Sequence, residues 1–301
     1  MEKNNLKVVT PTVKPKKNTL LMPHERTRVQ VVILAVIIFC LAFSFLPLFL
    51  TVVNAFKLDK QVMKNAFSLP KLSTMGEAAR LNFTAAWAGI KGVYFKTIFV
   101  ALIGAICETI IGALLAYILS FKDFYFKNFV FMLFISILLV PSIIGYPILV
   151  PLVRDTLGLG NTHFGYLIAM IGGSQVMGMF LFKTFFGQQP KSLYESAALD
   201  GANDFVIITR ITIPLAFPII LYYFVGCFSG IYNEYLWASL ILSGDKNTLT
   251  NKIYELVSEG GALEYGQSYA LYLIASVPLI ITVAISMKYF KSGEFAAGLK
   301  L

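Results

Sequence analysis

The sequence has few charged residues and lacks the motifs that bind phosphate, hold a metal or form a catalytic triad. Charged residues make up 14% of the 301 residues and apolar residues 57%, which is too apolar for a soluble domain of this length. No G-x-x-x-x-G-K-[ST] segment occurs, so the usual phosphate loop for ATP is absent. The two histidines, His24 and His163, are too few and too far apart to build a metal cluster or a Ser-His-Asp arrangement. We therefore predict no catalytic residues and no metal site.

Cysteine is also scarce, which excludes a disulfide framework. The three cysteines, Cys40, Cys107 and Cys227, all fall inside long apolar stretches and show no metal-ligand spacing. They are interpreted as small apolar fillers.

Long apolar runs are what the chain does contain. A transmembrane helix needs about 20 mostly apolar residues, and six segments qualify. The sequence therefore predicts an all-α integral membrane protein whose helices span about 29–56, 97–121, 128–153, 164–186, 215–242 and 265–290. Prolines 141, 147 and 151 predict a kink in the third helix, buried among neighbours that satisfy the freed carbonyls.

Basic residues indicate the orientation of these helices. Residues 1–28 carry seven Lys or Arg and three prolines, which predicts a basic tail ahead of a permanently anchored domain, 29–301. An N-terminus in the cytoplasm places 15 of the 25 basic residues inside, a modest positive-inside bias. The net charge of +9 needs no nucleic-acid partner, because basic residues flank the membrane spans. The polar loops at 57–96 and 243–264 are then expected outside.

One polar segment interrupts the apolar chain between Pro190 and Pro218. Pro190 suits a helix start, and Ser192 with Glu195 has the spacing of a capping box. Gly201 is placed to end this helix in a left-handed conformation, and a second short helix is expected to lead into Ile213.

This segment resembles the EAA loop of permease subunits in binding-protein-dependent ABC importers. Glu195, Ala197, Ala198 and Asp200-Gly201-Ala202 match its core, with Ser196 in place of a small alanine. Ile213, Pro214, Leu215 and Pro218 match the trailing I-x-L-P-L-x-x-P pattern. In that family the loop is a cytoplasmic coupling helix seated in a groove of the ATPase subunit. The resemblance implies a coupling segment at 187–213, in which the contacts come from Tyr194, Glu195, Ser196, Ala197, Ala198, Asp200, Gly201 and Ala202.

Four further stretches resemble carbohydrate permeases of the maltose type. These are Leu81–Trp87, Leu157–Thr162, Tyr232–Trp237 and the C-terminal stretch from Met287 to Lys300. For Leu81–Trp87, surface packing of the aromatics and contact with a solute-binding protein are both open readings.

The resemblance implies a six-helix permease of the type I ABC importer fold, the second permease of a sugar or oligosaccharide importer. Its implied partners are another permease, an ATPase dimer, an extracytoplasmic solute-binding protein and membrane lipids. The chain itself needs no cofactor, since ATP and Mg would be bound by the ATPase subunits. The expected location is the cell membrane of a bacterium or archaeon, with both termini in the cytoplasm.

Intramembrane polar residues are the candidates for a solute pathway. Asn233, Glu234 and Trp237 lie in the fifth span, where helix packing or an aromatic belt would explain them equally well. Glu108 lies about 16 Å into the second span, near the bilayer midplane.

Small residues flank Glu108 at helical spacing, namely Ala101, Gly104, Ala105, Gly112 and Ala116. Such a stripe allows close approach of another helix, so Glu108 is expected to point into the protein, as a packing carboxyl or as part of the pathway.

Two other functions remain open from the residues alone. An ion channel or secondary transporter could use Glu108 and Glu234 as an ion path, and an ABC permease for a non-sugar solute would differ only in the subfamily motifs.

Overall fold

The computed structural model describes residues 23–258 and 262–291, which are mostly helical and contain no β-strand. By internal contacts the chain divides into two units, Met1–Leu50 and Thr51–Leu301. Most of the predicted basic tail lies outside the described residues. A helical chain is the expected result, because helices satisfy every backbone polar group within an apolar segment.

The first unit is described from Pro23 onward by most of α1 (Pro23–Ala55). Its Val29–Ala55 stretch is apolar enough to cross a membrane and has no buried residue in its most apolar window. The helix begins six residues before the predicted position 29.

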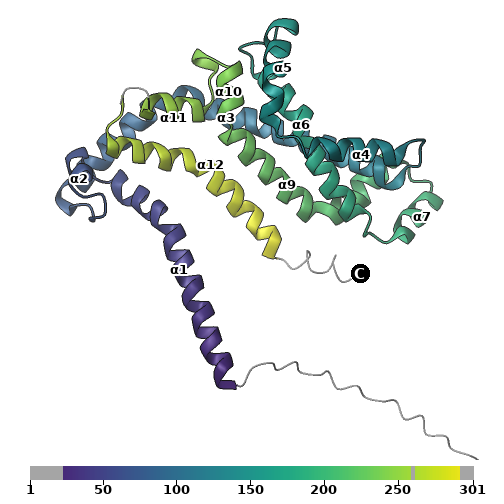
Figure 1. Ribbon diagram of the computed structural model, residues 1–301, viewed down its shortest axis with the longest axis horizontal. Helices are drawn as coiled ribbons and strands as arrows, with labels where there is room; N and C mark the ends of the chain where they lie inside the picture. The colour runs from purple at the N-terminus through teal and green to yellow at the C-terminus, as the bar shows by residue number, and fades with distance from the viewer. Residues whose placement is uncertain (1–22, 259–261, 292–301) are drawn as a thin grey trace, which may run out of the picture. The chain divides into compact units, whose positions relative to one another are not determined.

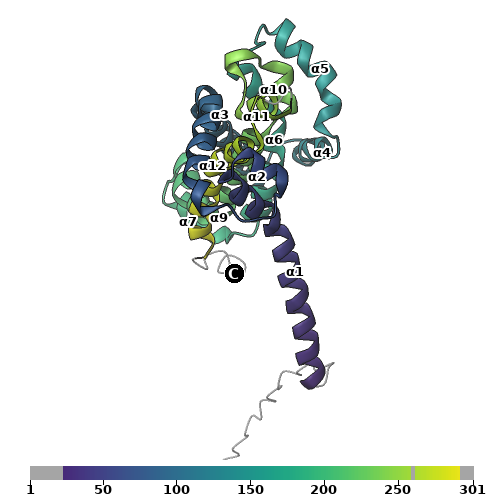
Figure 2. The ribbon, with the colours of Figure 1, turned by 90° about the vertical axis from the view of Figure 1, so that its left-hand side faces the viewer.

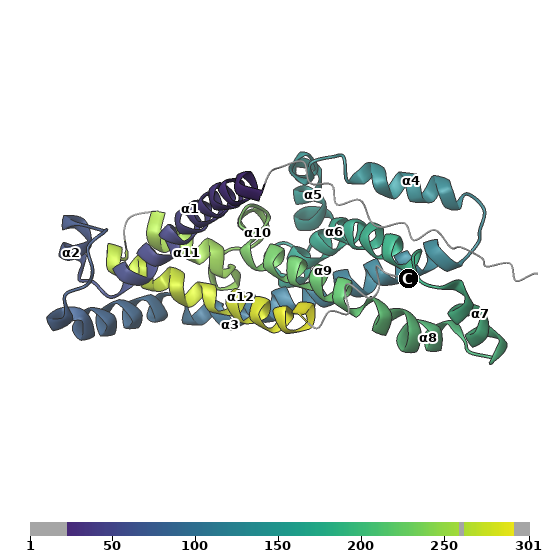
Figure 3. The same cartoon turned by 90° about the horizontal axis from the view of Figure 1, so that it is seen from below.

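The second unit is built around the 50-residue helix α3 (Leu72–Phe121), which runs behind α6 (His163–Phe186), α9 (Ile213–Asn233) and α12 (Tyr265–Lys291) in Figure 1. These three helices all pack on α3, and the four helices together supply most of the buried apolar residues. Shorter helices cap the two ends. In the view of Figure 3, α2 (Asp59–Lys64) lies at one end, while α7 (Lys191–Leu199) and α8 (Asp204–Ile207) lie at the other.

The small-residue stripe explains why α3 can be packed so closely. Ala101, Gly104, Ala105, Gly112 and Ala116 are all buried, and Glu108 at their centre is 1% exposed. A Cβ atom at Gly112 would lie 3.3 Å from backbone atoms of Gln175, Gly178 and Met179. The prediction that this face turns into the protein is confirmed.

The prediction of a loop over 57–96 is wrong for most of its length. Helix α3 begins at Leu72, so it is about 75 Å long and exceeds a hydrocarbon core of about 30 Å by some thirty residues. The lysines and arginine of this stretch mark where the apolar surface ends, and they do not end the helix. No proline follows Pro70 before Phe121, so nothing in the backbone interrupts it.

The third predicted span is broken into two pieces. Helix α4 (Lys127–Ile137) and the Ser142–Thr156 stretch, which contains α5 (Tyr146–Pro151), meet at an angle of 92°. The break ends at Pro141, whose ring and missing N–H disfavour helix at and before this point. A kink was predicted here, but the prediction of a buried outer half is wrong, because Val153 is the one buried residue of 142–156 in the described structure.

The fifth predicted span, 215–242, also contains a break. Glu234 has an extended backbone, with φ −65° and ψ 119°, and ends α9. The chain then forms α10 (Leu236–Ile241), which Figure 2 shows near α5. The predicted loop at 243–264 carries a helix of its own, α11 (Leu249–Ser258).

Asn82 joins α3 to the end of α1 and the turn after it. Its side-chain amide donates to the carbonyl oxygens of Ala55 and Lys57, each at 2.9 Å. Asn82 is 3% exposed, whereas Trp87 of the same predicted surface motif is 38% exposed and packs against Tyr94. The buried half of this motif is therefore structural.

Lys57 completes the same junction and is fully buried. Its ammonium group donates to Asn54 Oδ1 at 2.9 Å and to the carbonyls of Asn65 and Ala66 at 3.2 and 3.1 Å. Burial lowers the pKa of Lys57 from its usual value. The Asn65 carbonyl also accepts from the Ser68 hydroxyl at 2.9 Å.

We expect Asn82→Leu to destabilise the protein, because it leaves two buried carbonyls without their donor at about 1–3 kcal/mol each. A thermal unfolding scan in detergent should show a fall of several degrees. Thr84→Leu, at an exposed position of the same helix, is the control and should change little. Equal melting temperatures for both variants would contradict the structural role of Asn82.

Candidate functional site

The segment with the EAA resemblance forms a short helix and a tight turn. Helix α7 ends at Leu199, and Gly201 two residues later has a left-handed φ of +77°. The Ala202 N–H donates to Ala197 O at 2.9 Å and the Gly201 N–H to Ala198 O at 3.1 Å, the two bonds of a Schellman motif. The prediction for Gly201 is confirmed.

The start of α7 differs from the prediction. Pro190 precedes the helix and acts as its N-cap residue, and no side chain caps the helix. Ser192 is the second helical residue, so the predicted capping box of Ser192 and Glu195 is wrong. No side chain caps the helix because proline has no side-chain acceptor. The capping box does not form because the helix starts one residue before Ser192.

The second short helix leads into Ile213 as predicted and is continuous with the helix that follows. Asn203 Oδ1 accepts from the Val206 N–H at 3.0 Å and caps α8, which continues through the Ile208–Thr212 π-turn into α9. The chain from Asp204 to Asn233 is therefore one helical rod of 30 residues. A displacement of α7 would reach α9 through this rod.

Tyr194 fixes α7 on the body of the protein. Its ring stacks on Phe121 at 4.2 Å between centroids, and its hydroxyl bonds to Gln189 and to Thr212, the latter at 3.3 Å. Next to it, Asp204 accepts from Tyr117 at 2.9 Å and pairs with Lys122 at 2.7 Å. The last turn of α3 thus holds both sides of the segment.

The remaining side chains of α7 leave an accessible surface. Glu195, Ser196, Ala198, Asp200 and Gly201 are exposed, whereas Tyr194, Ala197 and Ala202 are half-buried and face the protein. Leu193 and Leu199 are 44% and 89% exposed, so α7 presents two apolar side chains to its surroundings. The described structure therefore presents a polar helix with apolar corners at one end of the unit.

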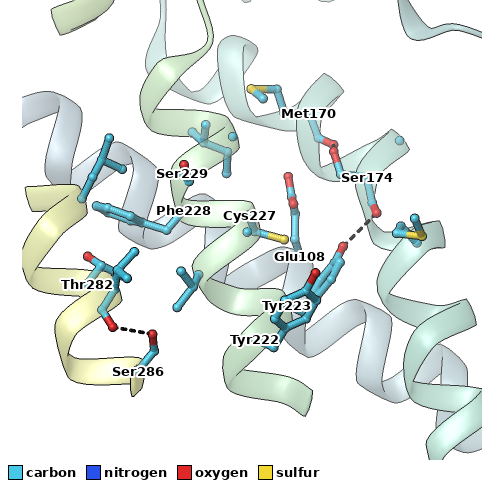
Figure 4. A pocket seen from close by; sticks show the side chains of 18 of the residues that line it. Glu108, Met170, Ser174, Tyr222, Tyr223, Cys227, Phe228, Ser229, Thr282 and Ser286 are labelled. Carbon is cyan, nitrogen blue, oxygen red and sulfur yellow. Dashed lines mark hydrogen bonds between the residues drawn. The ribbon is translucent and has the colours of Figure 1, made fainter. Parts of the chain in front are cut away.

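Two cavities lie along the middle helices. The first has a volume of about 720 Å³ and is lined by α3, α6, α9 and α12, including Glu108, Ser174, Cys227 and Thr282 (Figure 4). The second, of about 530 Å³, is lined around α5 and by Glu234 and Trp237. They share the lining residues Leu138, Met170, Gly173 and Ser174.

The break after α9 places Glu234 in the wall of the second cavity. Its carboxylate accepts from the Trp237 N–H at 2.8 Å and so caps the start of α10. Trp237 is 2% exposed, donates its indole N–H to Tyr166 O at 2.9 Å and packs on Tyr146. Trp237 is therefore a supporting wall of this cavity.

The four predicted pathway residues are thus separated. Glu108 lines the first cavity, and Glu234 and Trp237 line the second. Asn233 lines neither, and its amide donates to Ser229 O of the preceding helical turn at 2.9 Å.

Sequence reasoning missed the α6 residues that join the cavities. Gly172-Gly173-Ser174 is a small and polar triplet within an apolar helix, and this signal could have marked a cavity-facing position. It also missed Tyr223, whose hydroxyl donates to Ser174 O at 2.8 Å. Tyr223 carries no distinguishing sequence signal among the many aromatics of the chain.

The sequence of the chain is similar to those of known proteins. Residues 108–293 match the family described as binding-protein-dependent transport system inner membrane component. The Escherichia coli inner membrane ABC transporter permease protein YcjP is 31% identical over 69% of this chain and 74% of its own length. The Bacillus subtilis arabinooligosaccharides transport system permease protein AraQ is 26% identical over 84% of this chain and 90% of its own.

A solved structure has the same fold. One chain of a bacterial ABC transporter involved in the import of the acidic polysaccharide alginate superposes with a TM-score of 0.75. It is 21% identical, and the superposition covers 90% of this chain and 99% of that one. At this identity the likeness concerns the fold alone.

Proposed function

Since the chain belongs to the binding-protein-dependent transport system inner membrane component family, we propose that it is a sugar or oligosaccharide permease. It is a transporter subunit of an ABC importer and works with a solute-binding protein. A carbohydrate solute is supported by the maltose-type motifs and by the arabinooligosaccharide relative. In this proposal a second permease forms the other half of the pathway, and an ATPase dimer binds ATP and Mg.

The observation that carries this proposal is the accessible surface of α7. A helix with exposed Leu193 and Leu199, fixed from behind by Tyr194, fits the groove of another protein subunit. ATP-driven closure of the ATPase dimer would displace α7, and the continuous Asp204–Asn233 rod would transmit the displacement to both cavities. In this proposal the protein lies in the cell membrane of a bacterium or archaeon, and α7 and both termini face the cytoplasm.

Leu199→Asp should release the ATPase from the assembled importer. Burial of a leucine contributes about 1.5–3 kcal/mol, so replacing it by a charge should weaken the complex at least tenfold. The measurement is the amount of ATPase that co-purifies with the tagged permease.

Leu72→Asp is the matched control for this experiment. Leu72 is 86% exposed against 89% for Leu199, and it lies at the α2 end of α3, opposite α7 (Figure 3). It should retain the ATPase. Retention of the ATPase by both variants would overturn the role of Leu199 in docking. Absence of any ATPase from the purified parent, together with solute flux driven by an ion gradient, would overturn the proposed function in favour of an ion-coupled transporter.

A further inference from the structure

Glu108 is the most deeply buried carboxylate of the described chain that faces a cavity. The residue is 1% exposed, and its carboxylate points from α3 into the first cavity in Figure 4. Its Oε1 atom accepts no hydrogen bond from the described residues. A buried carboxylate oxygen without a donor is costly, which indicates that this atom serves a ligand more than it serves packing.

The surroundings of Glu108 are polar but uncharged. The Ser174 side chain on α6 and the Cys227 thiol on α9 line the same cavity, and the Ser174 hydroxyl donates to the Met170 carbonyl at 2.8 Å. Further around the cavity lie the hydroxyl groups of Tyr222, Tyr223, Ser229, Thr282 and Ser286. Hydroxyl groups donate and accept, so this lining suits a neutral solute rich in hydroxyl groups.

Any side-chain charge on the walls of the two cavities is negative. Their lining includes the carboxylates Glu108 and Glu234, and none of the described residues that line them is Lys, Arg or His. A charge in a wall of low dielectric acts over a longer range than one in water, and a cavity of one sign concentrates the opposite charge.

We propose that Glu108 determines the charge selectivity of this subunit, so that its cavity accepts neutral, hydroxyl-rich or cationic solutes and disfavours anionic ones such as uronate oligosaccharides. The proposal rests on the proposed function and specifies its substrate class. The expected charge preference is therefore opposite to that of a system that imports an acidic polysaccharide, such as the solved alginate transporter.

Thiol labelling of the assembled importer in membrane vesicles tests this directly. The reporter is Thr282→Cys, on α12 and in the lining of the same cavity, in a chain whose Cys40, Cys107 and Cys227 are replaced by alanine. The probes are two methanethiosulfonates of similar size, one carrying trimethylammonium and the other sulfonate. The labelling rate of each reagent at the reporter cysteine is divided by the rate of the same reagent with a free thiol in solution, which corrects for the difference in their intrinsic reactivity.

We expect the corrected cation-to-anion rate ratio to be about tenfold above one. Glu108→Gln should bring the ratio close to one, while Glu108→Asp should keep it high. Glu234→Gln is the control in the second cavity and should lower the ratio much less.

A ratio near one in the Thr282→Cys parent overturns the proposal, and so does a ratio unchanged by Glu108→Gln. Should Glu108→Gln fail to assemble, the Thr282→Cys parent and the Glu108→Asp variant still decide it. Labelling reads the charge of the cavity whether or not the ATPase co-purifies, so failure here is distinct from failure of the proposed function.

Discussion

Gly112→Leu should abolish assembly of the permease in the membrane. Even the first side-chain atom at this position would lie 3.3 Å from backbone atoms of Gln175, Gly178 and Met179 on α6. Backbone in a packed helix cannot move aside as a flexible side chain can, and a leucine adds three more carbons beyond that atom. The two helices would have to separate along the stripe that buries Glu108.

Overpacking of a core by one side chain commonly costs about 1–3 kcal/mol, and a clash with backbone lies at or above the top of that range. We expect most of the Gly112→Leu protein to aggregate or to be degraded. Size-exclusion chromatography of a fluorescent fusion in mild detergent measures the surviving fraction.

Gly92→Leu is the matched control, on the same helix at an exposed position where a Cβ would meet no atom within 4 Å. Both substitutions raise helix propensity equally, so a difference between them reports packing. A normal monodisperse peak for Gly112→Leu would mean that α3 and α6 do not approach as described.

Gly201→Val should eliminate transport while leaving the spans inserted. The φ of +77° at Gly201 is left-handed, and a β-branched residue there is strained. Without this turn, the Schellman bonds from Gly201 and Ala202 to the end of α7 cannot form together. Helix α7 would then lose its fixed direction relative to the Asp204–Asn233 rod.

We expect uptake of the importer's solute to fall more than tenfold for Gly201→Val, with normal protein levels in the membrane. Gly201→Asn is the informative comparison, because asparagine tolerates a left-handed conformation, and this variant should keep most of the uptake. The strain account fails if valine transports as well as asparagine.

Much of the architecture could be predicted from the residues alone. Long apolar runs made the spans around α1, α6 and α12 recognisable, because the cost of exposing a backbone in lipid leaves few alternatives to a helix. The prediction for Gly201 succeeded because a helix ending in glycine follows a local rule. The small-residue stripe succeeded because one helix face is set by sequence spacing.

The sequence could not reveal where a helix begins or ends when no local signal marks the boundary. The charges ahead of Lys96 suggested a loop, but α3 is helical from Leu72, because solvent-exposed helix tolerates charge. The break at Glu234 depends on tertiary contacts. The Glu234 carboxylate caps the start of α10, and Trp237 of α10 is held by its hydrogen bond to Tyr166. The break is favoured over a continued helix only once Trp237 is held in this way.

What the sequence by itself determined is therefore the membrane class, most spans, the family resemblance and the inward-facing side of Glu108. These properties depend on local composition and on the 3.6-residue period. Only the tertiary structure decided that Glu108 and Glu234 line separate cavities, joined through Ser174 on α6, and that Phe121 and Tyr194 hold α7 in place. Such contacts join residues 60 to 73 positions apart, and no local pattern encodes which helices meet, because that depends on the packing of the whole bundle.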